Sequence, residues 1–196
     1  MVLAISTDLL ENGPCARFEF GIVDAFLNAL QACDLIKSSW NEVLKSANAT
    51  GHHFGYFVFQ RVFQKDPSLK STFGLKHDDE ISEIPDDHEC IRHTKIFTNI
   101  IHLAAKNVDE LEPQVAPAIF KYGERHYNTK ASDRMTEENV RMVCAQVVCT
   151  VCDLLGDDAH PKIVEAWIEM MSSILDMQIV QKLPKHNRMR KANQQV

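Results

Sequence analysis

The chain has 196 residues, of which 45% are hydrophobic and 24% are charged, and its formal net charge is −6 at pH 7. This composition is typical of one globular domain with extensions and excludes a disordered chain. The negative charge argues against a general nucleic-acid-binding protein, because contacts to phosphates require a basic surface.

Helical periodicity covers most of the chain, and no alternating strand pattern is convincing. The predicted helices span residues 21–31, 33–48, 51–65, 87–106, 109–127, 136–155 and 161–182. These seven or eight helices are too irregular in length for a four-helix bundle. We divide the chain into an N-terminal extension (1–32) with one short helix, a helical domain (33–182), and a basic, flexible tail (183–196).

Several residues suggest where the predicted helices begin and end. Thr50 is a candidate N-cap for the third helix, and Thr136 begins the helix at 136–155. Pro67 opens a short turn-like piece that ends at Phe73, and a polar loop follows over 74–87. Pro113 and Pro117 should disturb the early turns of the helix at 109–127, and Pro161 lies in the first turn of the last helix.

The cysteines and the N-terminus bear on the compartment. Three of the six cysteines crowd the segment MVCAQVVCTVC, and the start MVLAISTDLLENGP lacks the basic region of a secretory signal. We therefore expect reduced thiols and a cytoplasmic location. No apolar run reaches membrane-spanning length, since FGIVDAFLNAL is short and contains Asp24.

Two histidines occupy the apolar faces of consecutive predicted helices. His93 continues, at intervals of four residues, into Phe97 and Ile101, and His126 follows Tyr122 by four residues. A buried imidazole costs free energy unless something bonds it, so each is either a bonded core residue or a ligand. Two nitrogen ligands are too few for a closed zinc site, but they suit the two axial positions of haem iron.

Two other metal or redox motifs are weak. HECIRH resembles the H-E-x-x-H zinc motif, but its second histidine comes one residue late and points away from the first. CTVC (149–152) has no following histidine for covalent haem attachment and no second pair for zinc. We interpret Cys149 and Cys152 as small core residues, and a redox role remains the alternative.

Three segments together resemble the globin family over roughly residues 33–182. RVFQKDPSLKSTF (61–73) resembles the globin B–C corner, RHTKIFTNIIHLAAKNVDEL (92–111) the E helix, and KYGERHYN (121–128) the end of the F helix. The second segment is closest to neuroglobin-like and nematode globins. The resemblance implies an all-α globin fold of about eight helices, with haem b held between the E and F helices.

The resemblance also assigns residues to the haem. It makes His126 the proximal ligand and His93 the distal histidine, and it matches Trp40 and Trp167 to the A and H helices. Ile96 stands where many globins place a polar residue near a propionate, so Arg92 or Lys95 is the alternative contact there. The full set of expected haem contacts is Phe59, Phe73, His93, Ile96, Phe97, Ile101, Tyr122, His126 and Val140. The Nδ1–H of His126 can donate to the carbonyl of Tyr122, which would aim Nε2 at the iron.

Three functions remain open from the sequence. The first is a six-coordinate globin, with His93 and His126 both on the iron, that transfers electrons or senses O₂, NO or redox state. The second is a five-coordinate globin that reversibly stores O₂, and the third is a haem-free helical interaction domain. We do not expect an enzyme, because NO dioxygenation or nitrite reduction needs a reductase and the chain lacks G-x-G-x-x-G.

The expected partners follow from these functions. They are the gases O₂, CO and NO and a redox partner, with no nucleic acid and no transmembrane segment. The helix near 21–31 either packs back on the domain or mediates a homodimer, and the extensions suit a module of a longer chain. The tail cations Lys182, Lys185, Arg188, Arg190 and Lys191 are candidates for contact with an anionic membrane surface.

Overall fold

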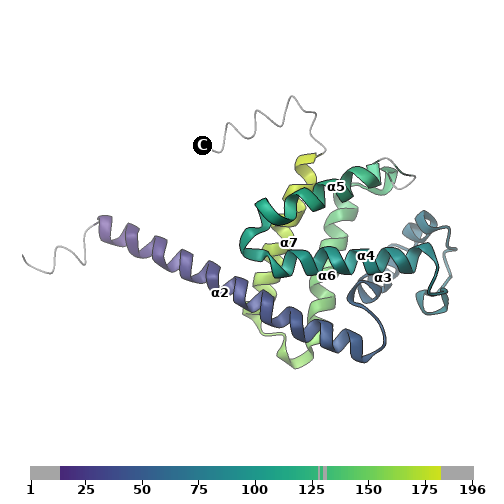
Figure 1. The fold of residues 1–196 in the computed structure, drawn as a ribbon, viewed down its shortest axis with the longest axis horizontal. Coiled ribbons are helices and arrows are strands. Elements are labelled where there is room, and N and C mark those ends of the chain that lie inside the picture. Colours follow the sequence, from purple (N-terminus) through teal and green to yellow (C-terminus); the bar gives the residue numbers. More distant parts are fainter. Residues whose placement is uncertain (1–13, 128, 130–131, 182–196) are drawn as a thin grey trace, which may run out of the picture.

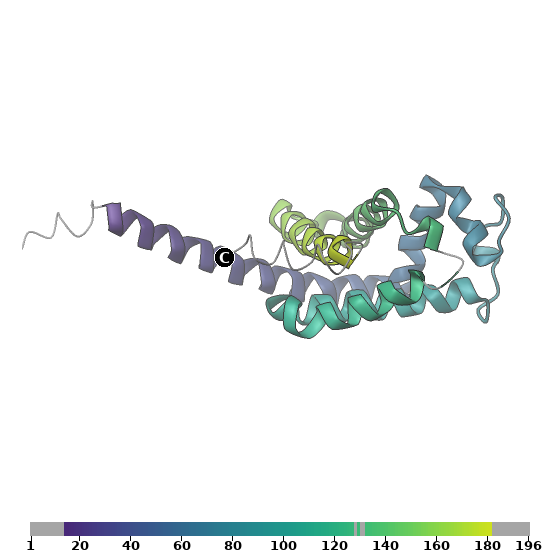
Figure 2. The same ribbon diagram turned by 90° about the horizontal axis from the view of Figure 1, so that it is seen from above.

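The computed structural model describes residues 14–127, 129 and 132–181, and among these it contains helices and no strand (Figures 1 and 2). The α-helices are α2 (Pro14–Ala49), α3 (Phe54–Lys65), α4 (Glu89–Lys106), α5 (Ala116–Tyr127), α6 (Glu137–Leu155) and α7 (Pro161–Gln181). Short 3-10 turns are η1 (Pro67–Phe73), η2 (Ile81–Glu83), η3 (Val108–Glu110), η5 (Ser132–Arg134) and η6 (Gly156–Asp158), and η4 (Leu111–Val115) is a π-helical turn. The predicted all-α fold is confirmed.

The N-terminal helix differs from the prediction. Residues 14–49 form one uninterrupted helix, so the expected boundary between helices at 21–31 and 33–48 is wrong. The physical reason is that Gln31, Ala32 and Cys33 include no proline or glycine, and nothing else there breaks the helical hydrogen bonds. The first half of α2 projects away from the other helices (Figures 1 and 2). Residues 1–13 and 182–196, which include the tail cations, lie outside the described residues.

Local signals set most of the other helix ends. Thr136 caps α6 by accepting a hydrogen bond from the Asn139 N–H at 3.1 Å, as predicted. Pro67 begins η1, while the expected disturbance around Pro113 takes the form of the π-helical turn before α5. Thr50 is not the N-cap of α3, since that helix begins at Phe54 and the Thr50 hydroxyl donates to the Ala47 carbonyl instead.

Two buried tryptophans join the layers of the core. Trp40 on α2 and Trp167 on α7 are both fully buried, and their ring centroids lie 5.7 Å apart. Each indole N–H has a partner: Trp40 donates to His102 Nδ1 on α4 and Trp167 donates to Ser39 Oγ on α2, both at 2.9 Å. These bonds satisfy polar groups that burial would otherwise penalise, and they tie α2, α4 and α7 together.

A glycine allows α3 and α4 to cross closely. A Cβ on Gly55 would lie 2.1 Å from the Thr94 carbonyl oxygen, which is well inside van der Waals contact. The Gly55 N–H donates instead to Thr98 Oγ1 at 2.8 Å. This crossing sets the distance between the side chains that α3 and α4 direct to the site described below.

One described helix is long and apolar enough, by length and composition, to cross a membrane. It is the segment Glu137–Asp158, whose mean hydropathy is 1.3. From the sequence we expect no apolar run of this length, so by length and hydropathy α6 differs from the prediction. In the structure α6 packs against α2, α3 and α7, as a core helix of the domain does.

Candidate functional site

An aromatic cluster fills the space where α3, η1 and α4 meet. Phe59 is its centre, with ring centroids 5.8 Å from Phe63, 5.9 Å from Phe73, 5.6 Å from Phe97 and 5.5 Å from His93. These rings meet edge to face, an arrangement that aromatic pairs favour. The cluster brings together Phe59, Phe73, His93 and Phe97, four of the residues that the sequence analysis assigns to the haem.

His93 faces this cluster and has a perturbed pKa. Its ring lies 5.3 Å from that of Phe73 as well as against Phe59. Burial, helped by the nearby His126 and opposed by Glu89, lowers the pKa of His93 to about 4. The imidazole is therefore neutral at pH 7, and a neutral imidazole is the form that binds a metal.

His126 lies in the last turn of α5 with one ring nitrogen already bonded. Its Nδ1 lies 2.7 Å from the Tyr122 carbonyl oxygen, one helical turn earlier, so the predicted hydrogen bond is present. A carbonyl only accepts, so Nδ1 carries the proton and Nε2 keeps its lone pair. This bond gives His126 the tautomer and orientation that a metal ligand needs.

The two histidines come directly together from α4 and α5. Their ring centroids lie 5.4 Å apart, with the ring planes at 87°. An imidazole nitrogen binds a first-row metal at about 2 Å and lies about 1.1 Å from its own ring centroid, so two imidazoles on opposite sides of one metal would have centroids about 6.3 Å apart. The pair therefore fits a shared iron after separating by roughly 1 Å, a small adjustment on the scale of this contact.

The other residues that the sequence assigns to the haem lie on α4, α5 and α6. Ile101 on α4 is buried in the core, whereas Ile96 is 41% exposed at the helix surface. The Arg125 guanidinium carbon lies 5.6 Å from the ring centroid of Tyr122 on α5. Val140 is half-buried in the first turn of α6. Their contacts with haem stay predictions.

Sequence reasoning missed three features that shape the site. Phe63 belongs to the cluster, since its ring centroid lies 6.1 Å from that of Phe73. Its position four residues after Phe59 could have predicted this, because residues four apart lie on the same face of a helix. His53 Nε2 lies 2.6 Å from Thr94 Oγ1, which joins the start of α3 to the turn that carries His93. Gly55 was the third, and only the distance between two helices reveals its role.

The weaker motifs form no site among the described residues. No group of three or more His, Cys, Asp or Glu side chains in that part of the chain is placed to hold a metal ion. Cys149 and Cys152 are free, half-buried thiols on α6. His88 caps α4 by accepting from the Cys90 N–H at 3.2 Å, so it does not join His93 in a zinc site.

Comparison with known proteins identifies the family. The model of the globin family, described as "Globin", matches residues 56–178, which is more than half of the chain. This chain belongs to the globin family. A flavohemoprotein of Halalkalibacterium halodurans is 23% identical over 143 residues, which cover 73% of this globin and 30% of the relative. This globin thus spans about a third of that protein's length.

Membership of the globin family gives the general function, and the two histidines described above agree with it. Globins bind haem and small gaseous ligands such as O₂, and most members of the family are not enzymes. In this globin, two imidazoles contact each other beside an apolar aromatic wall, and both would suit one iron. The residues present therefore fit the cofactor that the family carries.

Proposed function

We propose that this globin binds haem b with His126 as proximal ligand and His93 as the second axial ligand, and that it transfers electrons or senses O₂, NO or redox state. Haem iron supplies one-electron chemistry and binding of diatomic gases. The protein supplies two axial nitrogens, an apolar wall and the hydrogen bond that orients His126.

The observation that carries this proposal is the 5.4 Å separation of the two imidazoles. Direct coordination by both rings needs a centroid separation of about 6 Å, close to the one observed. A five-coordinate carrier needs more room, because a diatomic ligand must lie between the iron and His93. The observed spacing therefore favours six-coordination over reversible O₂ storage.

The aromatic wall supports the same choice. Phe59 and Phe97 pack against each other at 5.6 Å, and Phe59 also contacts His93. An external ligand would have to displace His93 and push it into this packed cluster. Its apparent affinity then falls by the fraction of molecules in which His93 has left the iron, which suits a sensor or electron carrier better than a store.

Optical spectra of the reduced, ligand-free protein test the proposal. We expect sharp, split visible bands from the parent and a change of axial ligation in both His93→Ala and His126→Ala. His77→Ala is the matched control, since His77 is exposed in the 74–87 loop. A broad single visible band in the parent supports the five-coordinate carrier. Purified protein that shows no Soret absorbance, even after haem is added, supports the haem-free domain.

Catalysis by this chain alone is not part of the proposal. The bacterial relative is named a flavohemoprotein, but this globin covers only 30% of it, so that protein's flavin is not carried over. NO dioxygenation or nitrite reduction would need a separate reductase, and turnover with a chemical reductant is the test. The cytoplasmic location likewise stays a proposal, based on reading the cysteines as reduced thiols.

A further inference from the structure

Two of the three cysteines on α6 lie at the surface of the domain. Cys144 packs against the hydrophobic core, whereas Cys149 and Cys152 are half-buried free thiols and are not among the side chains that do so. They lie beside an exposed stripe of the helix, since Ala145 and Asp153 are exposed at intervals of four from Cys149. The interpretation of this pair as small core residues therefore does not hold. We call Cys149 and Cys152 the dithiol.

Helix geometry places the two thiols of the dithiol side by side. Residues three apart in an α-helix have their Cα atoms about 5 Å apart and their Cβ atoms about 5–6 Å apart. The electrostatics agree with this proximity. Burial raises the pKa of Cys152, Cys149 and Asp153 raise it further, and Arg61 and a backbone hydrogen bond lower it. The two sulfur atoms are therefore close enough to act on one ligand.

The spacing of the dithiol favours a bridging ion over a disulfide. A disulfide needs Cβ atoms about 3.8 Å apart, so the two Cβ atoms would have to approach by about 1–2 Å within an uninterrupted helix. A metal ion between two thiolates, with metal–sulfur bonds of about 2.3 Å, holds the sulfurs up to about 4.6 Å apart. Rotation about the two Cα–Cβ bonds reaches that separation without bending α6.

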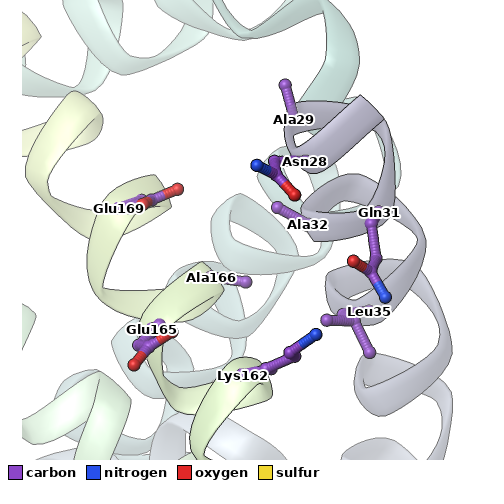
Figure 3. Close-up of a pocket in the computed structure, with 9 residues that line it drawn as sticks. All are labelled: Asn28, Ala29, Gln31, Ala32, Leu35, Lys162, Glu165, Ala166 and Glu169. Carbon is purple, nitrogen blue, oxygen red and sulfur yellow. The ribbon is translucent and has the colours of Figure 1, made fainter. Parts of the chain in front are cut away.

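Two thiolates without further ligands select a soft cation of low coordination number. Zinc takes four ligands, and no group of three or more His, Cys, Asp or Glu side chains in the described ranges is placed to hold a metal. Thiolates prefer soft ions, and Cu(I) is a soft ion that two thiolates satisfy. The groove between α2 and α7, of about 450 Å³, offers such an ion no rival site (Figure 3). Its charged lining is Lys162, Glu165 and Glu169, and carboxylates are hard donors.

A cation beside the dithiol offsets part of the charge that two thiolates bring. Arg61 of α3 donates from Nε to Gln146 Oε1 at 3.2 Å, and its guanidinium pairs with Asp153. Gln146 comes one turn before the dithiol and Asp153 directly after it, so the guanidinium lies along this stretch of α6. With a monovalent ion bound, these groups leave a single net negative charge, which water screens at the helix surface.

We propose that Cys149 and Cys152 bind a single Cu(I) ion as two thiolates on the surface of α6. The ion displaces both thiol protons, which pass to the buffer, and two copper–sulfur bonds form in their place. Neither copper nor sulfur changes its oxidation state in this step. The site uses none of the residues assigned to the haem, so it is independent of how the iron is coordinated.

Equilibrium dialysis of the full, haem-loaded chain against buffered Cu(I) without oxygen tests the site, with copper measured by plasma mass spectrometry. We expect a single copper per chain and a dissociation constant at least roughly 100-fold higher in C149S and in C152S, because each variant keeps only one thiolate. The matched control is C33S, which should bind like the parent. Cys33 is also a half-buried free thiol, but no second cysteine lies within one turn of it on α2. The Soret band should be the same in all these variants.

A charge variant tests the surroundings of the ion. R61Q should weaken binding roughly threefold by removing the neighbouring cation, whereas R141Q should not, because Arg141 pairs with Glu137 two turns before the dithiol. The proposal is overturned if the parent retains no Cu(I), or if C33S loses as much affinity as C149S. It is also overturned if glutathione disulfide, a small-molecule disulfide, removes two hydrogens from the dithiol in a chain that retains no copper, since the dithiol is then a redox pair.

Discussion

Replacing Gly55 by alanine tests how the crossing of α3 and α4 builds the distal side of the site. The new methyl group would lie 2.1 Å from the Thr94 carbonyl oxygen and 2.9 Å from Thr98 Oγ1. Ordinary carbon–oxygen contacts are more than 1 Å longer than the first distance, so the two helices must move apart. That movement also stretches the 2.8 Å hydrogen bond from the Gly55 N–H to Thr98.

The magnitude follows from three terms. Overpacking a close contact costs about 1–3 kcal/mol, and the weakened hydrogen bond costs about 1 kcal/mol. Alanine gains about 1 kcal/mol over glycine in a helix interior, and less at Gly55, which is the second residue of α3. The net expectation is a free energy of unfolding about 1–4 kcal/mol lower than that of the parent.

Urea unfolding followed by circular dichroism measures this change. Because the crossing also positions Phe59 against His93, we expect G55A to alter the Soret band of the haem-loaded protein. Gly51→Ala is the contrast: Gly51 has φ of +82°, and its Cβ would meet nothing within 4 Å. That variant costs about 1–2 kcal/mol from backbone strain alone and leaves the Soret band unchanged. If G55A proves as stable as the parent, the close crossing does not constrain the fold.

Three further predictions concern single side chains of the core and the site. Phe97→Val opens space beside Phe59, so binding of CO to the reduced protein should accelerate several-fold in stopped-flow measurements. In the haem-free protein, His93 has a pKa of about 4 when folded and about 6.5 when unfolded, so the unfolded chain binds a proton there first as the pH falls. The free energy of unfolding should therefore fall by about 3 kcal/mol between pH 6.5 and pH 4. Denaturant titrations should find a smaller fall in His93→Phe. Cys90 is fully buried and burial raises its pKa to about 12, so mass spectrometry after brief treatment with iodoacetamide should find Cys90 unmodified while the half-buried Cys149 and Cys152 react.

Local chemistry explains why much of the fold could be predicted. Prolines and cap residues act within one turn, so the starts of η1, α6 and α7 coincide with Pro67, Thr136 and Pro161. The placement of His93 and His126 on apolar faces follows from helical spacing alone, and the structure brings the two rings together. Each of these features can be predicted from a few neighbouring residues.

The features that could not be predicted depend on residues far apart in the chain. The role of Gly55 depends on Thr94, 39 positions away, and Thr50 lost the capping role to His53 because α2 ends in its own turn. The continuity of α2 was missed for a different reason. A change of apolar face near residue 31 resembles a break between helices, whereas in the structure one helix carries both the exposed Leu27 and Leu30 and the buried Ile36 and Trp40.

The two sides of the histidine pair are held differently, and this bears on how they would separate around an iron. The distal side is braced by the Gly55–Thr98 hydrogen bond, the contact between His53 and Thr94, and the rings around Phe59. The side-chain hydrogen bond of His126, in contrast, stays within α5, whose helix ends one residue later, and only its backbone carbonyl bonds beyond the helix, to Thr129. The adjustment of roughly 1 Å that a shared iron requires is therefore expected on the α5 side, with α4 as the fixed wall. An incoming gas would have to move the braced His93, and this asymmetry supports the proposal that both imidazoles stay on the iron.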